Sequence, residues 1–212
     1  MNPIISAQQV SKQYRVHRDR PDSLKEAVVR RQKNRSSSEF WALKDVSLDI
    51  EQGSFFGLIG HNGSGKTTLL KLMAGIHTPS SGQLKVNGRV SALLELGSGF
   101  HPELSGRENI YLNGAILGLT RKEMDLAVDE IIEFSDIGDF IDAPVKILSS
   151  GMYVRLGFAV AVHVAPEILL IDEVIAVGDE AFQRKCLEHL YELRRAGTTI
   201  VLVSHSLPLV EG

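Results

Sequence analysis

Apolar side chains recur along this chain with two different spacings, and each spacing predicts one type of element. Alternating or continuous apolar runs of strand length occupy six stretches: residues 4–16, 40–50, 54–59, 83–96, 168–171 and 198–203. Asn87-Gly88 interrupts the fourth stretch, which predicts one or two strands with a hairpin turn at that dipeptide. The run at 168–171 is entirely apolar and bounded by charge, as is typical of a central parallel strand.

Other stretches repeat apolar residues every three or four positions, which predicts helices at residues 68–77, 107–117, 121–134, 150–164 and 180–195. Ser105 with Glu108, and Thr120 with Glu123, have the spacing of capping boxes. Because strands and helices alternate, the sequence predicts an α/β fold with a helical subdomain inserted between strands.

Composition narrows the possible functions. The chain has 212 residues, enough for one core with an inserted subdomain, and its net charge of −3 gives no general reason to expect nucleic-acid binding. Cys186 is the single cysteine, so no intrachain disulfide can form, and a reducing compartment fits. No secretory signal opens the chain and no apolar run reaches the ~20 residues of a membrane span, so a membrane role requires a partner.

A basic segment at residues 17–39 separates the first two strands and contains a possible short helix at 23–31. Two interpretations remain open for this segment. It is either a solvated basic loop or a docking element for anionic lipid headgroups or an acidic partner.

The strongest chemical signal is a glycine-rich loop between the strand that ends at Ile59 and the helix that begins near Thr68. It fits the phosphate-loop pattern Gly-x-x-x-x-Gly-Lys-Thr, and its residues are Gly60, His61, Asn62, Gly63, Ser64, Gly65, Lys66 and Thr67. Glycines accept positive φ, which turns the backbone N–H groups inward as an anion-binding nest. Lys66 would reach the β- and γ-phosphates and the Thr67 hydroxyl would bind Mg²⁺; a chance glycine-rich turn is the alternative.

Further candidates lie downstream of the loop and near the N-terminus. Asp172 and Glu173 follow the apolar strand, where Asp172 would bind Mg²⁺ beside Thr67 and Glu173 would polarise a water for attack on the γ-phosphate. A solvated acidic strand end is the alternative. Ser149 or Ser150 is expected to cap a helix. Tyr14 would stack on a nucleobase or be an ordinary strand aromatic, and the residues alone favour the second interpretation.

In their order along the chain, four motifs resemble an ATP-binding cassette (ABC) ATPase over nearly its whole length. They are the phosphate loop, Leu148-Ser149-Ser150-Gly151-Met152, the apolar strand with Asp172-Glu173, and Val203-Ser204-His205. Five further features resemble the branch that exports O-antigen polysaccharide and teichoic acid: residues 153–161, 93–97, 99–103, 106–110 and the basic segment.

The resemblance implies a P-loop NTPase ABC ATPase fold. This has a RecA-like parallel core sheet, an N-terminal antiparallel β-subdomain and an inserted α-helical subdomain. Residues 1–96 would form the β-subdomain and the first part of the core, 97–164 the helical subdomain, and 165–212 the second part of the core. Members of the family continue beyond the His205 motif, so we expect this sequence to be part of a longer protein.

The resemblance also implies roles for individual residues. Tyr14 would stack on adenine, and Glu173 and His205 would be catalytic. The ATP-binding set would be residues 60–67 with Thr68, while Ser149, Ser150, Gly151 and Met152 would contact the ATP held by a second copy of the chain. Asp179 would lie where the chain crosses to the ATP site of the second copy. Family members carry a coupling Gln that is missing between residues 88 and 108 here, and Glu95 is the nearest polar candidate.

These roles imply an ATP-hydrolysing subunit of a transporter for a lipid-linked polysaccharide, with ATP and Mg²⁺ as cofactors. Its partners would be a second copy of itself and a polytopic membrane permease, at the cytoplasmic face of a bacterial inner membrane and without nucleic acid. Two alternatives are a soluble ABC-type ATPase acting on nucleic acid or the ribosome, and a nucleotide-gated binding module that does not hydrolyse ATP.

Overall fold

A parallel sheet forms the centre of the computed structural model, which describes residues 3–16, 38–94, 97, 99–172 and 178–204. Its strand order is β3-β7-β6-β5, and all neighbouring pairs are parallel. The strands are β3 (Phe55–Ile59), β5 (Val90–Leu93), β6 (Ile168–Asp172) and β7 (Thr199–Ser204). The short helix expected at residues 23–31 lies outside the described residues.

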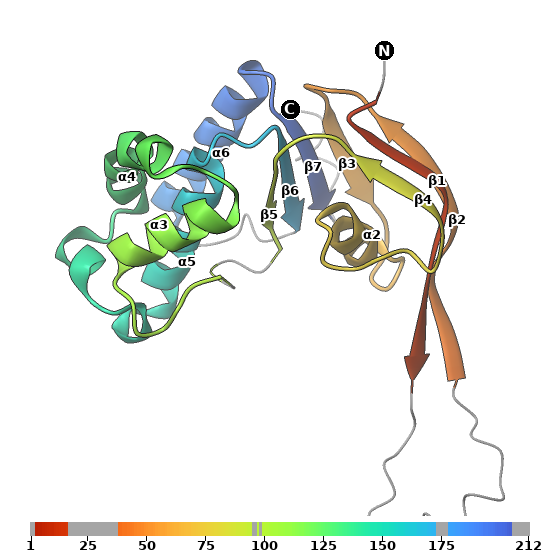
Figure 1. Cartoon of the computed structure of the whole chain (residues 1–212), viewed down its shortest axis with the longest axis horizontal. Helices are drawn as coiled ribbons and strands as arrows, with labels where there is room; N and C mark the ends of the chain where they lie inside the picture. Colours follow the sequence, from red (N-terminus) through yellow and green to blue (C-terminus); the bar gives the residue numbers. More distant parts are fainter. Residues whose placement is uncertain (1–2, 17–37, 95–96, 98, 173–177, 205–212) are drawn as a thin grey trace, which may run out of the picture.

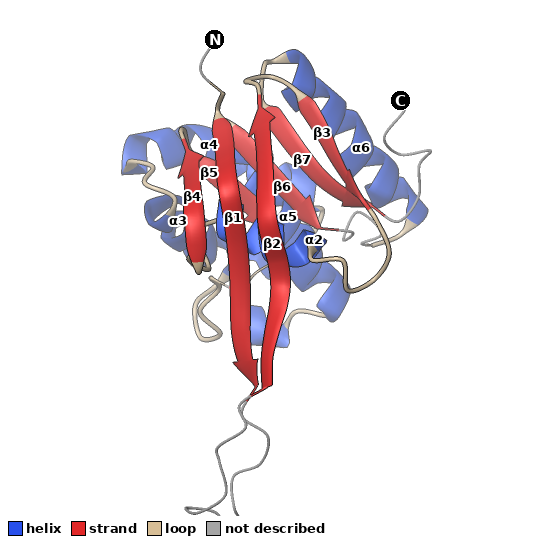
Figure 2. Ribbon diagram, turned by 90° about the vertical axis from the view of Figure 1, so that its right-hand side faces the viewer, coloured by secondary structure: helices blue, strands red, loops and turns tan. Residues whose placement is uncertain are grey.

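A second, antiparallel sheet has the order β2-β1-β4. Its strands are β1 (Ile5–Val16), β2 (Ser38–Ile50) and β4 (Ser81–Val86). Strand β4 pairs with β1 only as far as Ser11, whereas β1 and β2 remain paired to Val16 and Ser38. The last part of β1 and the first part of β2 therefore form a two-stranded arm beyond the sheet (Figure 2).

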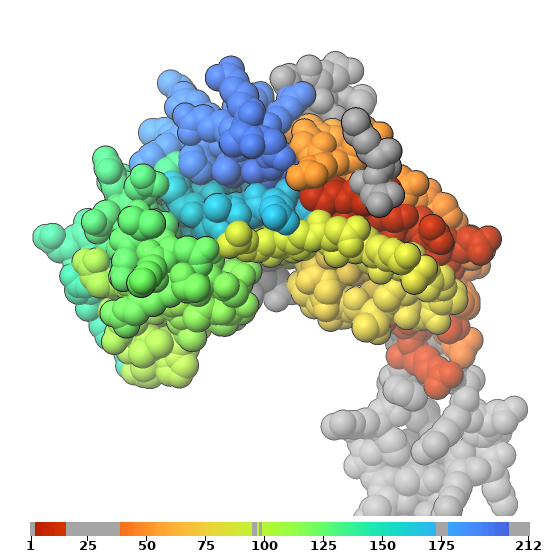
Figure 3. All heavy atoms as spheres, turned by 45° about the horizontal axis from the view of Figure 1, so that its top comes forward, coloured from red at the N-terminus to blue at the C-terminus, as the bar shows by residue number. Residues whose placement is uncertain are grey.

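The hairpin expected at Asn87-Gly88 is wrong, because the two strands that flank it belong to different sheets. The Asn87 amide donates to the Ile4 carbonyl at 2.8 Å, which holds the end of β4 on β1. Gly88 then turns at φ 132°, and the Arg89 amide donates to Glu167 Oε2 at 3.0 Å. Figure 3 shows this yellow segment crossing from the red and orange lobe to the green helical lobe.

Three helices and two short 3₁₀ turns form the lobe on the left of Figure 1. The helices are α3 (Gly106–Ile116), α4 (Arg121–Ser135) and α5 (Ser150–His163), and the 3₁₀ turns are η1 (Gly138–Asp142) and η2 (Val145–Ile147). Both predicted capping boxes are confirmed, at Ser105 with Glu108 and at Thr120 with Glu123. No helix within the described residues has the length and apolar content of a membrane span.

Strand β6 is buried on both faces, which explains its continuous apolar sequence. Leu169 and Ile171 belong to a core shared with the helical lobe and with α6 (Glu180–Arg195). Ile168 and Leu170 belong to a second core, which includes α2 (Lys66–Met73) and the antiparallel sheet. The parallel sheet therefore joins the two lobes, and its carboxyl edge lies between them.

Helix α2 ends at Met73, so the expected extension to residue 77 is wrong. Gly75 adopts φ 72°, which a residue with a Cβ atom rarely does. Its amide donates to Leu72, and the Ile76 amide donates to Lys71, which is the hydrogen-bond pattern of a Schellman ending. The apolar spacing continues past this point, but Gly75 stops the helix.

Candidate nucleotide-binding site

The loop between β3 and α2 is curled by two glycines with positive φ, Gly63 at 81° and Gly65 at 92°. Gly65 is the N-cap of α2, and no side chain caps this end. The helix therefore presents backbone N–H groups and the positive end of its dipole toward the loop, as an anion site requires. Lys66 Nζ lies at the loop, donating to the carbonyls of Gly60 at 2.7 Å and His61 at 3.0 Å.

Strand β2 packs directly on this loop. A Cβ atom added to Gly65 would lie 2.5 Å from the Ala42 carbonyl oxygen and 2.7 Å from Leu43 Cδ2. Such distances are closer than real Cβ atoms approach backbone, so only glycine fits here. A Cβ on Gly60 would lie 2.9 Å from Ser64 Oγ. The antiparallel sheet therefore helps to hold the loop in shape.

The loop forms one wall of a cavity of about 240 Å³. Loop residues 62–68 line it, and four further lining residues come from three strands: Phe40 and Ala42 from β2, Asp172 from β6 and Val203 from β7. The cavity thus opens at the carboxyl ends of adjacent parallel strands, where α/β sheets bind ligands.

Thr67 and Asp172 line the same cavity although more than a hundred positions separate them in the sequence. Hydroxyl and carboxylate oxygens suit Mg²⁺, which commonly binds through one or two protein ligands together with phosphate oxygens and water. The part of the chain that the structure describes contains no group of three or more His, Cys, Asp or Glu side chains able to hold a metal. One hydroxyl and one carboxylate in a shared cavity fit the protein's part of such a Mg²⁺ site.

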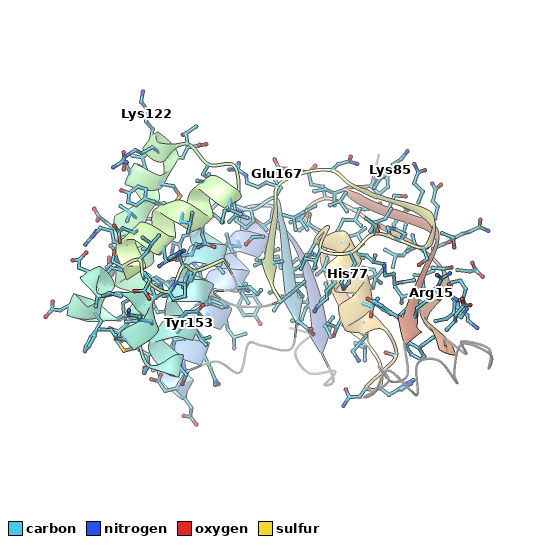
Figure 4. All side chains as sticks on the ribbon, turned by 60° about the horizontal axis from the view of Figure 1, so that its bottom comes forward. Arg15, His77, Lys85, Lys122, Tyr153 and Glu167 are labelled. Carbon is cyan, nitrogen blue, oxygen red and sulfur yellow. The ribbon has the colours of Figure 1, made fainter. Side chains whose placement is uncertain are left out.

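The turn at Ser149 opens α5 in the other lobe. Ser149 is the N-cap, as one interpretation predicts, and its Oγ accepts a hydrogen bond from the Met152 amide at 3.2 Å. Ser149, Ser150 and Gly151 are exposed, and none of them lines the loop cavity. Figure 4 shows Tyr153 of α5 and His77, which follows α2, on opposite lobes of the molecule. The fold therefore leaves the turn and the loop apart within one chain.

Behind this turn, Tyr153 connects α5 to the segment that follows β5. Its hydroxyl donates to the Gly97 carbonyl at 2.6 Å, and its ring lies edge-on to Phe100 with centroids 5.2 Å apart. Phe100, Tyr153 and Ser150 also line a second cavity, of about 450 Å³. Tyr153 therefore joins the first turn of α5 to Gly97 and Phe100.

Asp179 is the N-cap of α6 and accepts a hydrogen bond from the Phe182 amide at 2.9 Å. Its carboxylate also pairs with Arg155 of α5, which bonds to Asp136 Oδ2 at 3.2 Å. The hydrogen bond from Phe182 is the main cause that lowers the pKa of Asp179, and the Arg155 charge lowers it further. Asp179 therefore stays ionised and connects the start of α6 to the helix that the Ser149 turn opens.

The sequence matches the family described as "ABC transporter" over residues 43–176. The chain belongs to the ABC transporter family. It is 58 % identical over 181 residues to "O-antigen export system ATP-binding protein RfbB" of Myxococcus xanthus, a match that covers 85 % of this chain and 41 % of that protein. It is 45 % identical to the protein of the same name in Klebsiella pneumoniae, over 100 % of this chain and 87 % of that protein.

A third relative is "Teichoic acids export ATP-binding protein TagH" of Listeria monocytogenes. It is 44 % identical, and the match covers 98 % of this chain and 61 % of that protein. The cassette thus spans less than two thirds of the Myxococcus and Listeria proteins. The family that the motifs indicate is confirmed.

Two solved structures have the same fold. One is a dimeric ATP-binding cassette in a post-hydrolysis state bound to ADP and Pi, with a TM-score of 0.76 and 21 % identity over 97 % of this chain and 90 % of that chain. The other is an ATP-binding subunit of an ABC transporter, with a TM-score of 0.78 and 21 % identity. That match covers 98 % of this chain and 82 % of the other chain. The predicted ABC ATPase fold is confirmed.

Several expected site residues of the cassette lie outside the described residues or away from the cavity. Glu173, His205 and Glu95 are outside the described residues, so their roles stay predictions. Tyr14 is described but does not line the cavity. Its ring lies edge-on to His77 at a centroid distance of 5.9 Å.

Three lining residues, Phe40, Ala42 and Val203, were not identified from the sequence. Phe40 is the strand partner of Tyr14, so the pairing of β1 with β2 is the signal that leads to it. Val203 ends the predicted strand 198–203, and the order of the strands in the sheet brings it beside the loop.

Proposed function

We propose that this cassette binds and hydrolyses ATP as a subunit of an ABC transporter that exports a lipid-linked polysaccharide of the O-antigen or teichoic acid type. The observation that carries the proposal is the single cavity lined by loop residues 62–68 and by Asp172. The backbone amides of the loop, the Lys66 ammonium group and the Asp172 carboxylate all belong to residues that line this cavity. The names of the three relatives support the class of polysaccharide.

In this mechanism the loop amides, Lys66 and Thr68 bind the phosphate chain, and Thr67 with Asp172 holds Mg²⁺. The metal neutralises part of the charge on the phosphates when it is bound. Glu173 polarises the attacking water and His205 helps to hold it near the γ-phosphate. Base chemistry of this kind requires a carboxylate within hydrogen-bond reach of the water, and Glu173 directly follows the cavity residue Asp172.

A second copy of the chain completes the site. Ser149, Ser150, Gly151 and Met152 of one copy contact the γ-phosphate bound by the other, and Asp179 lies where the two copies meet. The exposure of residues 149–151, away from the cavity of their own chain, supports this arrangement. Two ATP molecules would then hold a head-to-tail dimer together.

The remaining partner is a polytopic permease. Residues 97–164 act as the helical subdomain between two parts of the core, 1–96 and 165–212, and pass the motion of the dimer to the permease near Glu95. The subunit is peripheral, at the cytoplasmic face of the inner membrane. Nothing in the family relationship or in the net charge of −3 favours the nucleic-acid alternative.

The test is Glu173→Gln in the full chain, with Glu188→Gln on the exposed surface of α6 as the matched control. Glu173→Gln should bind Mg-ATP, form a stable dimer by size exclusion, and lower turnover by about a hundredfold or more, as loss of a general base does. Glu188→Gln should turn over ATP like the unmodified chain. Unchanged turnover in Glu173→Gln would remove Glu173 from the mechanism, and a lack of Mg-ATP affinity in the unmodified chain would overturn the proposal.

A further inference from the structure

Phe40 lies at the edge of the loop cavity although it is far from the loop in sequence. It belongs to β2, in the arm that β1 and β2 form (Figure 2). The exposed fraction of its surface is 56 %. Ala42, two positions further along β2, lines the same cavity. The β1–β2 pairing shifts register at Ala42, so the cavity lining, and not strict alternation along the strand, shows that both side chains reach the cavity.

The position of Phe40 relative to the phosphate loop is set by backbone packing. The Ala42 carbonyl and the Leu43 side chain lie against Gly65, too close for any Cβ atom at that position. Leu43 is buried and Gly65 opens α2, so this part of β2 is anchored in the core. The β2 backbone two residues before this contact therefore lies close to the loop, which agrees with Phe40 lining the cavity.

The residues that line the cavity supply two kinds of chemistry. The amides and the polar side chains that bind phosphate belong to loop residues 62–68 and to Asp172. Among the described residues that line the cavity, Phe40 alone is aromatic. A triphosphate bound at the loop leaves its nucleoside pointing away from the amides, and an exposed flat ring beside that path suits stacking against a base.

Tyr14, the residue that the family resemblance assigns to the base, is the direct partner of Phe40 across the two strands. Directly opposed residues on one face have Cβ atoms roughly 5 Å apart. The Tyr14 ring has other neighbours: His77, and the Lys12 ammonium at 5.3 Å from its centroid. Lys12 is held there by a hydrogen bond to the Thr78 carbonyl at 2.8 Å.

We propose that Phe40 provides a second aromatic surface that stacks on the base of the bound nucleotide, beside Tyr14. The inference rests on the proposed ATP site and adds a residue that binds the base without touching the phosphates. It predicts that Phe40 contributes to the affinity for a nucleoside triphosphate and not to the affinity for a triphosphate without a base.

The experiment measures the Kd of Mg-ATP and of inorganic tripolyphosphate with Mg²⁺ by titration calorimetry on the full chain. Phe40→Ala should raise the Kd for Mg-ATP by about fivefold to a hundredfold, and Phe40→Tyr should restore it, because stacking requires only a flat ring. The Kd for tripolyphosphate should not change in either variant. Phe140→Ala is the matched control, since Phe140 is 52 % exposed, lies in the helical lobe and does not line the cavity.

The outcomes separate this inference from the proposed function. An equal effect of Phe40→Ala on both ligands, or no effect on either, would overturn the stacking role while leaving the ATP site in place. Lys66→Ala serves as the reference for the site itself and should weaken both ligands. If Lys66→Ala leaves both affinities unchanged, the loop is not the phosphate site, and the proposed function fails independently of Phe40.

Discussion

The phosphate loop and the Ser149 turn both open a helix, but only the loop requires its glycine within one chain. Gly65 has φ 92° and lies against the backbone of β2, so both its conformation and its contacts exclude a side chain. Gly151 lies in the first turn of α5, and a Cβ there would meet only Ser149 Oγ, at 4.0 Å. Among the described residues of one chain, nothing explains why position 151 is glycine.

The contrast shows how a structural glycine can be told from one that serves an intermolecular site. Glycine in a helix interior is less favourable than alanine by about 0.5–1 kcal/mol. Gly151 is the second residue of α5, so it has up to this cost, and no contact among the described residues offsets it. A close approach by another molecule would account for it. The proposed contact with the γ-phosphate held by a second copy is such an approach.

The largest effect is expected at the loop. Gly65→Ala should lower the free energy of unfolding by more than about 3 kcal/mol and abolish Mg-ATP binding, because strain at positive φ adds to the clash with Ala42. Gly118→Ala is the control: Gly118 has φ 83° but open space around it, so only the conformational cost of about 1–2 kcal/mol should appear. Urea unfolding measures both, and equal losses would mean that β2 does not constrain the loop.

A smaller but more specific effect is expected at the Ser149 turn. Gly151→Ala should leave the isolated chain as stable as before or more stable by about 0.5 kcal/mol, and Mg-ATP affinity of the monomer should not change. ATP-dependent dimerisation and turnover should fall at least about tenfold, because the added methyl group would block the partner's phosphate. Size exclusion with Mg-ATP and steady-state ATPase assays decide the matter. Normal turnover in this variant would contradict the proposed role of the turn.

The smallest effect concerns the far end of α5. The His163 ring stacks on His189 with centroids 4.5 Å apart, and its Nδ1 lies 2.8 Å from the Ala159 carbonyl oxygen. Burial is the main cause that lowers the pKa of His163. The Ala159 carbonyl and Glu130 raise this pKa, whereas His189 and Lys185 lower it further.

The sign of the pH effect follows from this shift. The unfolded chain binds the proton more tightly than the folded chain, so stability is lost as the pH falls below the unfolded pKa of about 6.5. The melting temperature should therefore decrease between about pH 7.5 and 5.5, and less so in His163→Gln. An equal decrease in both proteins would assign the pH dependence to other groups.

Local spacing in the sequence was enough to predict the phosphate loop, both capping boxes, a helix cap at Ser149 or Ser150, and the buried strand β6. Each of these depends on residues within a few positions of one another, so a short window of sequence contains the cause. Helix α6, expected at residues 180–195, also has the bounds Glu180–Arg195. The order of these motifs indicated the family, which the comparisons confirm.

Tertiary structure decided what depends on distant partners. It assigned β4 and β5 to different sheets, because Asn87 bonds to Ile4 and Arg89 to Glu167. It also placed Phe40 in the loop cavity. The partners in these contacts lie tens of positions apart in the sequence. A local pattern does not specify which distant segment a residue will contact. The residues that bind phosphate can therefore be predicted from the sequence. The other residues that line the cavity depend on how the two sheets pack.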